Sequence, residues 1–300
     1  MKAGLIEITA ISNAVGLLSC LLNLFTAFYL QTTSHILGKM TVVLSLMDVL
    51  FSIPGPLTLL VSYSPLYCRA LSFVFVFGLT GSLSWACCLA YGLYRSVQKE
   101  NPELMNTLFS KFIIVTTTIA TVFASYSALA PLKDVNDDGY CDYLSPMQDD
   151  SYHAIDLAII LPSLLAAVVN ILCYLATFFK LKESTGRFHF DLLMYPTVFI
   201  IRIAPWIYTA LYTQITGASY PFYFIIAAAT VLWNLQGFFN GILYGCSRTV
   251  VDRYREKCCF SRKSHKSSSR ASDIRPVPSL FIERYSALSN GSFPSNPSNP

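Results

Sequence analysis

The sequence predicts an all-α membrane protein, a bundle of seven transmembrane helices followed by a C-terminal amphipathic helix on the membrane surface. Two observations carry this prediction. Of the 300 residues, 54% are hydrophobic and only 13% are charged, whereas roughly 25% are charged in a typical soluble domain. The apolar residues also fall into seven blocks of about the length, roughly 20 residues, that is needed to cross a bilayer.

The seven blocks define the predicted helices and a single membrane domain over residues 1–246. They are long and lack the strict alternation of polar and apolar residues that is typical of membrane β-strands. The predicted helices span residues 5–30, 40–62, 68–94, 112–132, 152–179, 190–212 and 220–245. No loop between them is long enough to hold a second domain.

Lysine and arginine predict which side each loop faces, because cytoplasmic loops carry an excess of both. With the N-terminus outside and the C-terminus in the cytoplasm, the short internal loops hold seven of these residues and the external side holds three. The external three are Lys2, Arg69 and Lys133. The net charge of +4 therefore indicates a basic face beside anionic membrane lipid and not a nucleic-acid interface.

Two further segments follow the seventh predicted helix. Residues 247–260 place Val250, Val251 and Tyr254 on one helical face with most basic residues elsewhere, as expected of a helix lying on a membrane. This segment closes on Cys258 and Cys259, which are either palmitoylation sites or two unmodified thiols. Residues 261–300 are rich in Ser, Pro and Asn, which predicts a disordered cytoplasmic tail.

The longest external loop contains "KDVNDDGYCDY", which has the start of a calcium-binding loop. Asp134, Asn136, Asp138 and Gly139 stand at the spacing D-x-N-x-D-G. An EF-hand also needs a bidentate Glu at its twelfth position, where this chain has Ser145. The sequence therefore argues against a micromolar calcium site.

Cysteine positions predict one disulfide on the external side. Of the nine cysteines, only Cys68 and Cys141 are expected to face the oxidising side of the membrane. A bond between them would hold the acidic loop across the helix bundle.

Ionisable side chains within predicted helices point to function, because a charge inside a membrane is costly. Asp48 lies in "VLSLMDVLFSI" of the second helix, and Arg202 lies mid-helix in "VFIIRIAPWIY" of the sixth. Two interpretations stay open, a structural ion pair and a polar network that rearranges between two states of the bundle. The predicted network and its hinge comprise Asn23, Asp48, Arg202, Pro205, Trp206, Asn234, Gln236, Asn240 and Tyr244.

The seventh helix carries a specific resemblance. Its "LWNLQGFFNGILYG" resembles the last helix of the slime-mould cyclic-AMP receptors and cyclic-AMP receptor-like proteins, which are seven-helix G-protein-coupled receptors. The run from Gln236 to Phe239 and the closing Leu243-Tyr244 are also similar to secretin-type receptors. Asn240 and Tyr244 have the spacing of the rhodopsin-like Asn-Pro-x-x-Tyr motif, with Gly241 in place of proline. The third helix ends in "AYGLYRSVQ" without the Asp/Glu-Arg-Tyr motif of rhodopsin-like receptors.

The resemblance implies a plasma-membrane receptor whose helix six moves about Pro205 when an extracellular ligand binds, so that the cytoplasmic face meets a heterotrimeric G-protein. The implied G-protein contacts are Arg95, Lys99, Lys180, Lys182 and Arg187. Kinase and arrestin-like regulators are further implied partners, and the candidate phosphorylation sites are Ser264, Ser267, Ser268, Ser269 and Ser272. A polybasic tail that only binds lipid is the alternative. The acidic external loop would repel an anion, so cyclic AMP itself is not expected as the ligand.

Other classes of function have weaker support in the sequence. A small transporter or channel could line its path with Asp48 and Arg202. The four histidines lie in loops, at helix ends or in the tail and form no zinc site, so we expect neither a metal nor an enzyme. Residues 220–245 contain no lysine to bind retinal, and no other cofactor is expected.

Overall fold

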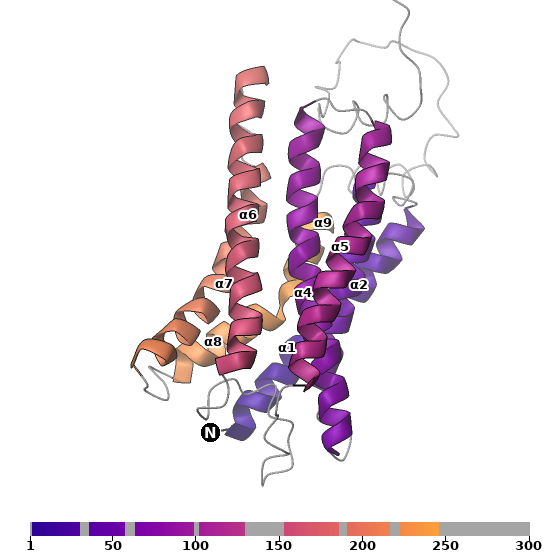
Figure 1. Cartoon of the computed structure of the whole chain (residues 1–300). Helices are drawn as coiled ribbons and strands as arrows, with labels where there is room; N and C mark the ends of the chain where they lie inside the picture. Colours follow the sequence, from indigo (N-terminus) through magenta and orange to yellow (C-terminus); the bar gives the residue numbers. More distant parts are fainter. Residues whose placement is uncertain are drawn as a thin grey trace, which may run out of the picture.

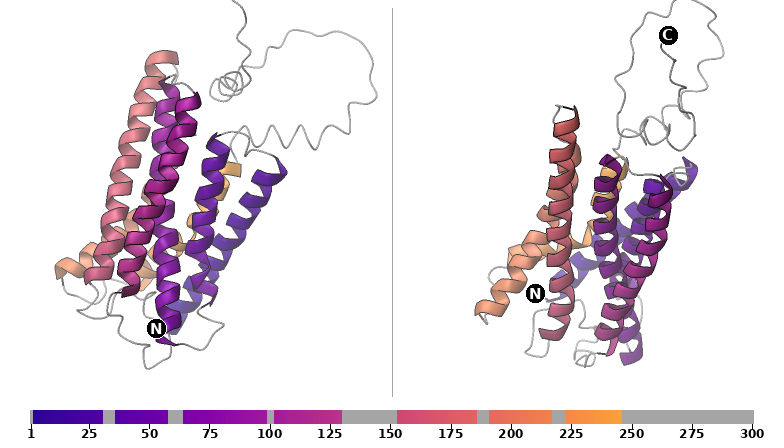
Figure 2. Two further views of the ribbon diagram at one scale, coloured as in Figure 1. Left: turned by 45° about the vertical axis from the view of Figure 1, so that its right-hand side comes forward. Right: turned by 45° about the horizontal axis from the view of Figure 1, so that its top comes forward.

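The structure is a computed structural model that describes residues 2–30, 36–57, 64–98, 102–129, 153–185, 191–216 and 223–245. Its described residues form helices and short turns without a strand, which confirms the predicted all-α class for this part of the chain. The elements are α1 (Lys2–Tyr29), α2 (Ile36–Ser52), α3 (Pro54–Leu57), α4 (Pro65–Val97), α5 (Pro102–Leu129), α6 (His153–Thr185), α7 (Asp191–Thr216), α8 (Tyr223–Asn234) and α9 (Gln236–Gly245). The long helices lie alongside one another as a bundle (Figures 1 and 2).

Five of these helical stretches are long and apolar enough to cross a membrane. They are Glu7–Tyr29, Gly38–Leu57, Leu66–Arg95, Asn106–Leu129 and Ile159–Lys180. Large apolar side chains project outward from them, among them Phe25 and Leu172 at 66% and 61% exposure. Such surfaces are stable in lipid but not in water, so the chain is a membrane-embedded protein. The sixth predicted helix corresponds to α7, whose apolar stretch Pro196–Pro205 is shorter.

Two predicted helices are interrupted in the structure. The second begins at Ile36, ends at Ser52 and is followed by the single turn α3, because Pro54 and Pro56 lack the backbone N–H that would continue the ladder. The seventh divides at Leu235 into α8 and α9. Leu235 still donates to the Val231 carbonyl at 3.0 Å and accepts from the Phe239 amide at 3.0 Å, so this break is a local bend and not a loop.

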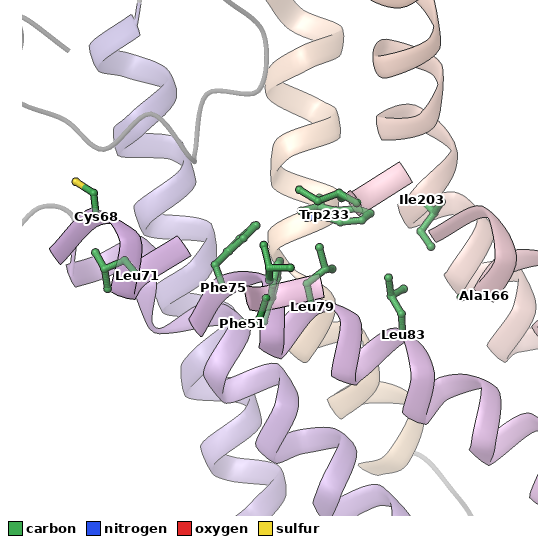
Figure 3. Close-up of a cluster of buried hydrophobic side chains, with 12 residues drawn as sticks. Phe51, Cys68, Leu71, Phe75, Leu79, Leu83, Ala166, Ile203 and Trp233 are labelled. Carbon is green, nitrogen blue, oxygen red and sulfur yellow. The ribbon is translucent and has the colours of Figure 1, made fainter. Parts of the chain in front are cut away.

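The core is centred on α4, which packs against α2, α5 and α6. Its buried residues Leu79 and Leu83 face the same region as Trp233 of α8 and Ile203 of α7 (Figure 3). Phe51 of α2 packs beside Phe75, with ring centroids 5.0 Å apart. A smaller cluster of Met40, Leu44 and Trp85 joins α2 to α4 further along. The core therefore brings α2, α4, α7 and α8 together around one interior.

Glycines set the closest helix contacts, because only a residue without a side chain lets two backbones approach so tightly. A Cβ added to Gly237 of α9 would meet the Cys20 Sγ and would lie 2.9 Å from the Gly16 carbonyl oxygen of α1. The last described helix is thus packed directly on the first one.

Substituting alanine for Gly237 tests this contact. We expect Gly237→Ala to lower the free energy of unfolding by about 1–3 kcal/mol, since the added methyl overpacks the interface. Because the added methyl meets both the Cys20 side chain and the Gly16 backbone carbonyl oxygen, the double variant Gly237→Ala/Cys20→Ala should recover only part of that loss. Thermal unfolding in detergent measures both, and a Gly237→Ala variant as stable as the unsubstituted protein would contradict the α1–α9 contact.

Candidate functional site: a buried polar network around Asp48

The candidate site is a carboxylate held at the centre of the bundle by three helices. Asp48 of α2 is fully buried. Its Oδ1 accepts hydrogen bonds from the Ser82 Oγ of α4 at 2.5 Å and from the Gln236 Nε2 of α9 at 2.6 Å. Its Oδ2 accepts from the Asn240 Nδ2 of α9 at 2.7 Å. The network thus joins α2, α4 and α9.

The spacing on α9 explains how one short helix reaches both oxygens of the carboxylate. Gln236 and Asn240 are four residues apart and therefore share a helical face. Gln236 is the first residue of α9, directly after the bend at Leu235, so the bend sets its direction. Its Nε2 also contacts the Ser82 Oγ. Burying a carboxyl group is costly unless hydrogen bonds satisfy it, and here both oxygens accept from neighbouring helices.

Arg202 of α7 is the second buried charge near this interior. Only 4% of its surface is exposed, and its Cζ lies 5.1 Å from the ring centroid of Phe199 and 5.8 Å from that of Trp233. Among the described residues its Nε has no hydrogen-bond partner. The hydrogen bonds to the Asp48 carboxyl group come from Ser82, Gln236 and Asn240, and within this part of the chain it forms no salt bridge with Arg202. A direct ion pair is therefore not the arrangement in this structure.

The structure brings together only part of the predicted network. Asn234, the last residue of α8, donates from its Nδ2 to the Ser12 Oγ of α1 at 3.3 Å instead of contacting Asp48. Asn23 of α1 lies against α9, where a Cβ on Gly241 would be 2.7 Å from its Nδ2. Pro205 is half-buried in α7. Trp206 and Tyr244 have described backbones, but their side chains lie outside the described part.

Ser82 is the network residue that the sequence did not reveal. It sits in "GLTGSLSWACC", where several small and polar residues are candidates for the same helical face. Serines are common in membrane helices, where they often bond to their own backbone; Ser163 does so with the Ile159 carbonyl at 2.7 Å. Only its position opposite Asp48 distinguishes Ser82 from such residues.

The predicted cytoplasmic contacts are described only in part. Arg95 lies in the last turn of α4, where its Nη1 donates to the Tyr91 hydroxyl at 3.3 Å. Lys180 and Lys182 are exposed towards the end of α6. The C-terminal ends of α4 and α6 lie at the same end of the bundle (Figure 1). Lys99 and Arg187 lie outside the described residues.

Several other predictions concern residues that the structure does not describe. Cys68 is buried at the start of α4 and is not among the free thiols of the described part, which are Cys20, Cys87, Cys88 and Cys173. Its predicted partner Cys141 lies outside the described residues, so the disulfide stays a prediction. The same holds for the calcium-like loop, the amphipathic segment 247–260 and the tail 261–300. These include Cys258, Cys259 and the candidate phosphorylation sites Ser264, Ser267, Ser268, Ser269 and Ser272.

Within the described ranges, no group of three or more His, Cys, Asp or Glu side chains could hold a metal ion.

Comparison of the sequence with protein-family models gave no match, and comparison with curated proteins gave none either. The case for a function thus depends on the sequence motifs and on the geometry around Asp48.

Proposed function

We propose that this chain is a seven-helix G-protein-coupled receptor of the plasma membrane, with its N-terminus outside and its C-terminus in the cytoplasm. It senses an extracellular ligand and activates a heterotrimeric G-protein by rearranging its helices. The observation that carries the proposal is the Asp48 carboxylate, which ties α2, α4 and α9 together while Arg202 of α7 lies nearby without a salt bridge.

This arrangement suits a switch between two states. The hydrogen bonds to Asp48 cross between helices, so α9 cannot move relative to α2 and α4 without exchanging them. In a buried site such an exchange favours two discrete arrangements over a continuum. Arg202 has an unused Nε donor and offers the carboxylate an alternative partner in the second state. A ligand that binds one state more tightly shifts the population toward it.

The proposal gives the interrupted helices a role. The bend at Leu235 lies directly before Gln236, and Pro205 lies three residues after Arg202. Gln236 and Arg202 therefore each lie beside a position where a helix can bend. Movement of α7 about Pro205 would change the distance between Arg202 and Asp48. The same movement would open the end of the bundle that carries Arg95, Lys180 and Lys182, where the G-protein is proposed to bind together with Lys99 and Arg187.

Nucleotide exchange tests the proposal directly. Membranes holding the full chain would be combined with a panel of purified heterotrimeric G-proteins, and GTP analogue binding would be measured with and without an extracellular ligand library. We expect Asp48→Asn to change the ratio of stimulated to basal exchange about fivefold or more, the lower end of typical coupling. The matched control is Glu7→Gln, which alters an exposed acid of α1 and should leave the ratio unchanged.

A flux measurement separates the receptor from the transporter or channel considered from the sequence. The same purified protein in vesicles would be tested for passage of ions and small solutes. Solute flux that Asp48→Asn abolishes, together with a chain that stimulates no G-protein of the panel, would contradict the receptor proposal.

A further inference from the structure

A second buried polar cluster lies on α1, and it shares no hydrogen bond with Asp48. Asn13 is fully buried, and neither its Nδ2 nor its Oδ1 has a hydrogen-bond partner among the described residues. The same is true of the Oγ of Ser52, which is also fully buried. Buried polar atoms are paired in more than about nine cases in ten, so three unpaired atoms in one region point to something that binds there.

Glycine contacts place both groups at the same contact between α1 and the α2–α3 segment. A Cβ on Gly55 would lie 2.5 Å from the Asn13 Nδ2, and a Cβ on Gly16 would lie 3.4 Å from the Ser52 Oγ. Asn13 and Gly16 are three residues apart on α1, so they share a helical face. Ser52 and Gly55 are also three residues apart, on either side of the break between α2 and α3. The Asn13 amide and the Ser52 hydroxyl therefore lie diagonally opposite each other where these two segments pack.

The bend between α8 and α9 closes a third side of this cluster. A Cβ on Gly16 would lie 2.8 Å from the backbone carbonyl oxygen of Asn234. The Asn234 side chain donates to Ser12, the residue before Asn13. Both helix interruptions thus meet α1 within about one turn.

The chemistry of the unpaired atoms indicates which kind of ligand could bind between Asn13 and Ser52. The Asn13 amide needs an acceptor for its N–H groups and a donor for its carbonyl oxygen, while the Ser52 hydroxyl can do either. An anion would satisfy only the donors, and a cation would satisfy only the oxygens. We propose that a water molecule binds here and bridges Asn13 to Ser52. This inference does not depend on the proposed receptor function.

The prolines of α3 provide an independent reason for water at this position. Pro54 and Pro56 cannot donate to the carbonyls four residues earlier, those of Leu50 and Ser52. In membrane helices, carbonyls freed by proline are satisfied by ordered water and by polar side chains of neighbouring helices. Water at the Ser52 end of α2 would supply the Ser52 hydroxyl and the Ser52 carbonyl that Pro56 leaves free.

Thermal unfolding of the full chain in lipid nanodiscs tests the proposal, because the direction of the change in Tm differs with and without bound water. A bridging water makes Asn13 and Ser52 useful partners, so Asn13→Leu and Ser52→Ala should each lower Tm, by about 2–4 °C. The double variant should lose less than the sum, because either change already removes the bridge. Without bound water, each substitution removes an unsatisfied polar group and should raise Tm.

A rise in Tm of either single variant, or losses that add up, would overturn the proposal. The control Ser163→Ala removes a buried hydroxyl that is satisfied within its own helix and should change Tm little. Because leucine at position 13 would crowd Gly55, Ser52→Ala is the decisive single variant.

An experimental structure that resolves ordered water supplies the direct check. Density within hydrogen-bonding distance of the Asn13 amide and the Ser52 Oγ supports the site, and a direct protein partner for that amide overturns it.

Discussion

Replacing Asp48 with leucine is expected to eliminate most of the folded protein. The change removes the Asp48 acceptor of the Asn240 Nδ2, the Gln236 Nε2 and the Ser82 Oγ and leaves the last two only each other, and each buried donor left without its acceptor costs about 1–3 kcal/mol. Together these losses are a large part of a typical folding free energy of about 5–15 kcal/mol. Fluorescence-detected size exclusion should show the loss of the monodisperse peak.

Graded substitutions distinguish lost hydrogen bonding from a general effect of altering Asp48. Asp48→Asn keeps the shape and one acceptor oxygen, so it should lower Tm by less than Asp48→Leu. Glu7→Gln serves as the control for changing an acid elsewhere in the membrane part. If Asp48→Leu matched Glu7→Gln in peak height and Tm, the buried network would not contribute to stability.

The second large effect is expected at the contact between α2 and α4. A Cβ on Gly78 would clash with the Phe51 backbone nitrogen and would lie 2.8 Å from the Leu50 carbonyl carbon. Backbone atoms cannot move aside without shifting the helix, so Gly78→Ala must separate α2 from α4. Since Asp48 and Ser82 lie on these two helices, the separation should also weaken their hydrogen bond. We expect a loss above the usual overpacking cost of about 1–3 kcal/mol, measured by thermal unfolding.

Gly81→Ala is the matched control for this prediction. It lies three residues further along α4, and its added Cβ would meet the Met47 Sδ at 2.7 Å. That atom is at the end of a flexible side chain, which can adopt another rotamer at small cost. Equal losses in Tm for Gly78→Ala and Gly81→Ala would contradict the close backbone approach seen here.

Residues that stand out chemically in an apolar sequence could be predicted as site residues. Asp48, Gln236 and Asn240 were expected in a shared network because charges and amides are costly in a membrane interior, and the structure joins all three. Arg202 was placed near them, but its aromatic neighbours Phe199 and Trp233 belong to two different helices. Phe199 lies three residues before Arg202 on the same helix, so only the contact with Trp233 depends on the packing of α7 on α8.

The remaining features depend on contacts that a linear sequence does not encode locally. Ser82, Asn13 and Ser52 look like any small polar residue of a membrane helix, and they differ only in what lies opposite them. Asn23, expected in the same network, lies against Gly241, the residue after Asn240. The all-helical class followed from composition and block length. The bend at Leu235, in contrast, contains no proline and keeps its backbone hydrogen bonds, so hydropathy gives no sign of it.

The contact between α1 and the α8–α9 pair has a consequence for how the protein is made. The Ser12–Asn234 hydrogen bond joins residues 222 positions apart, and Gly16 packs against the backbone carbonyl oxygen of the same Asn234. During synthesis α1 leaves the ribosome first, yet these partners emerge last. Until then Ser12 and Gly16 lack this neighbour. Completion of the described membrane part thus depends on translation of its final helices.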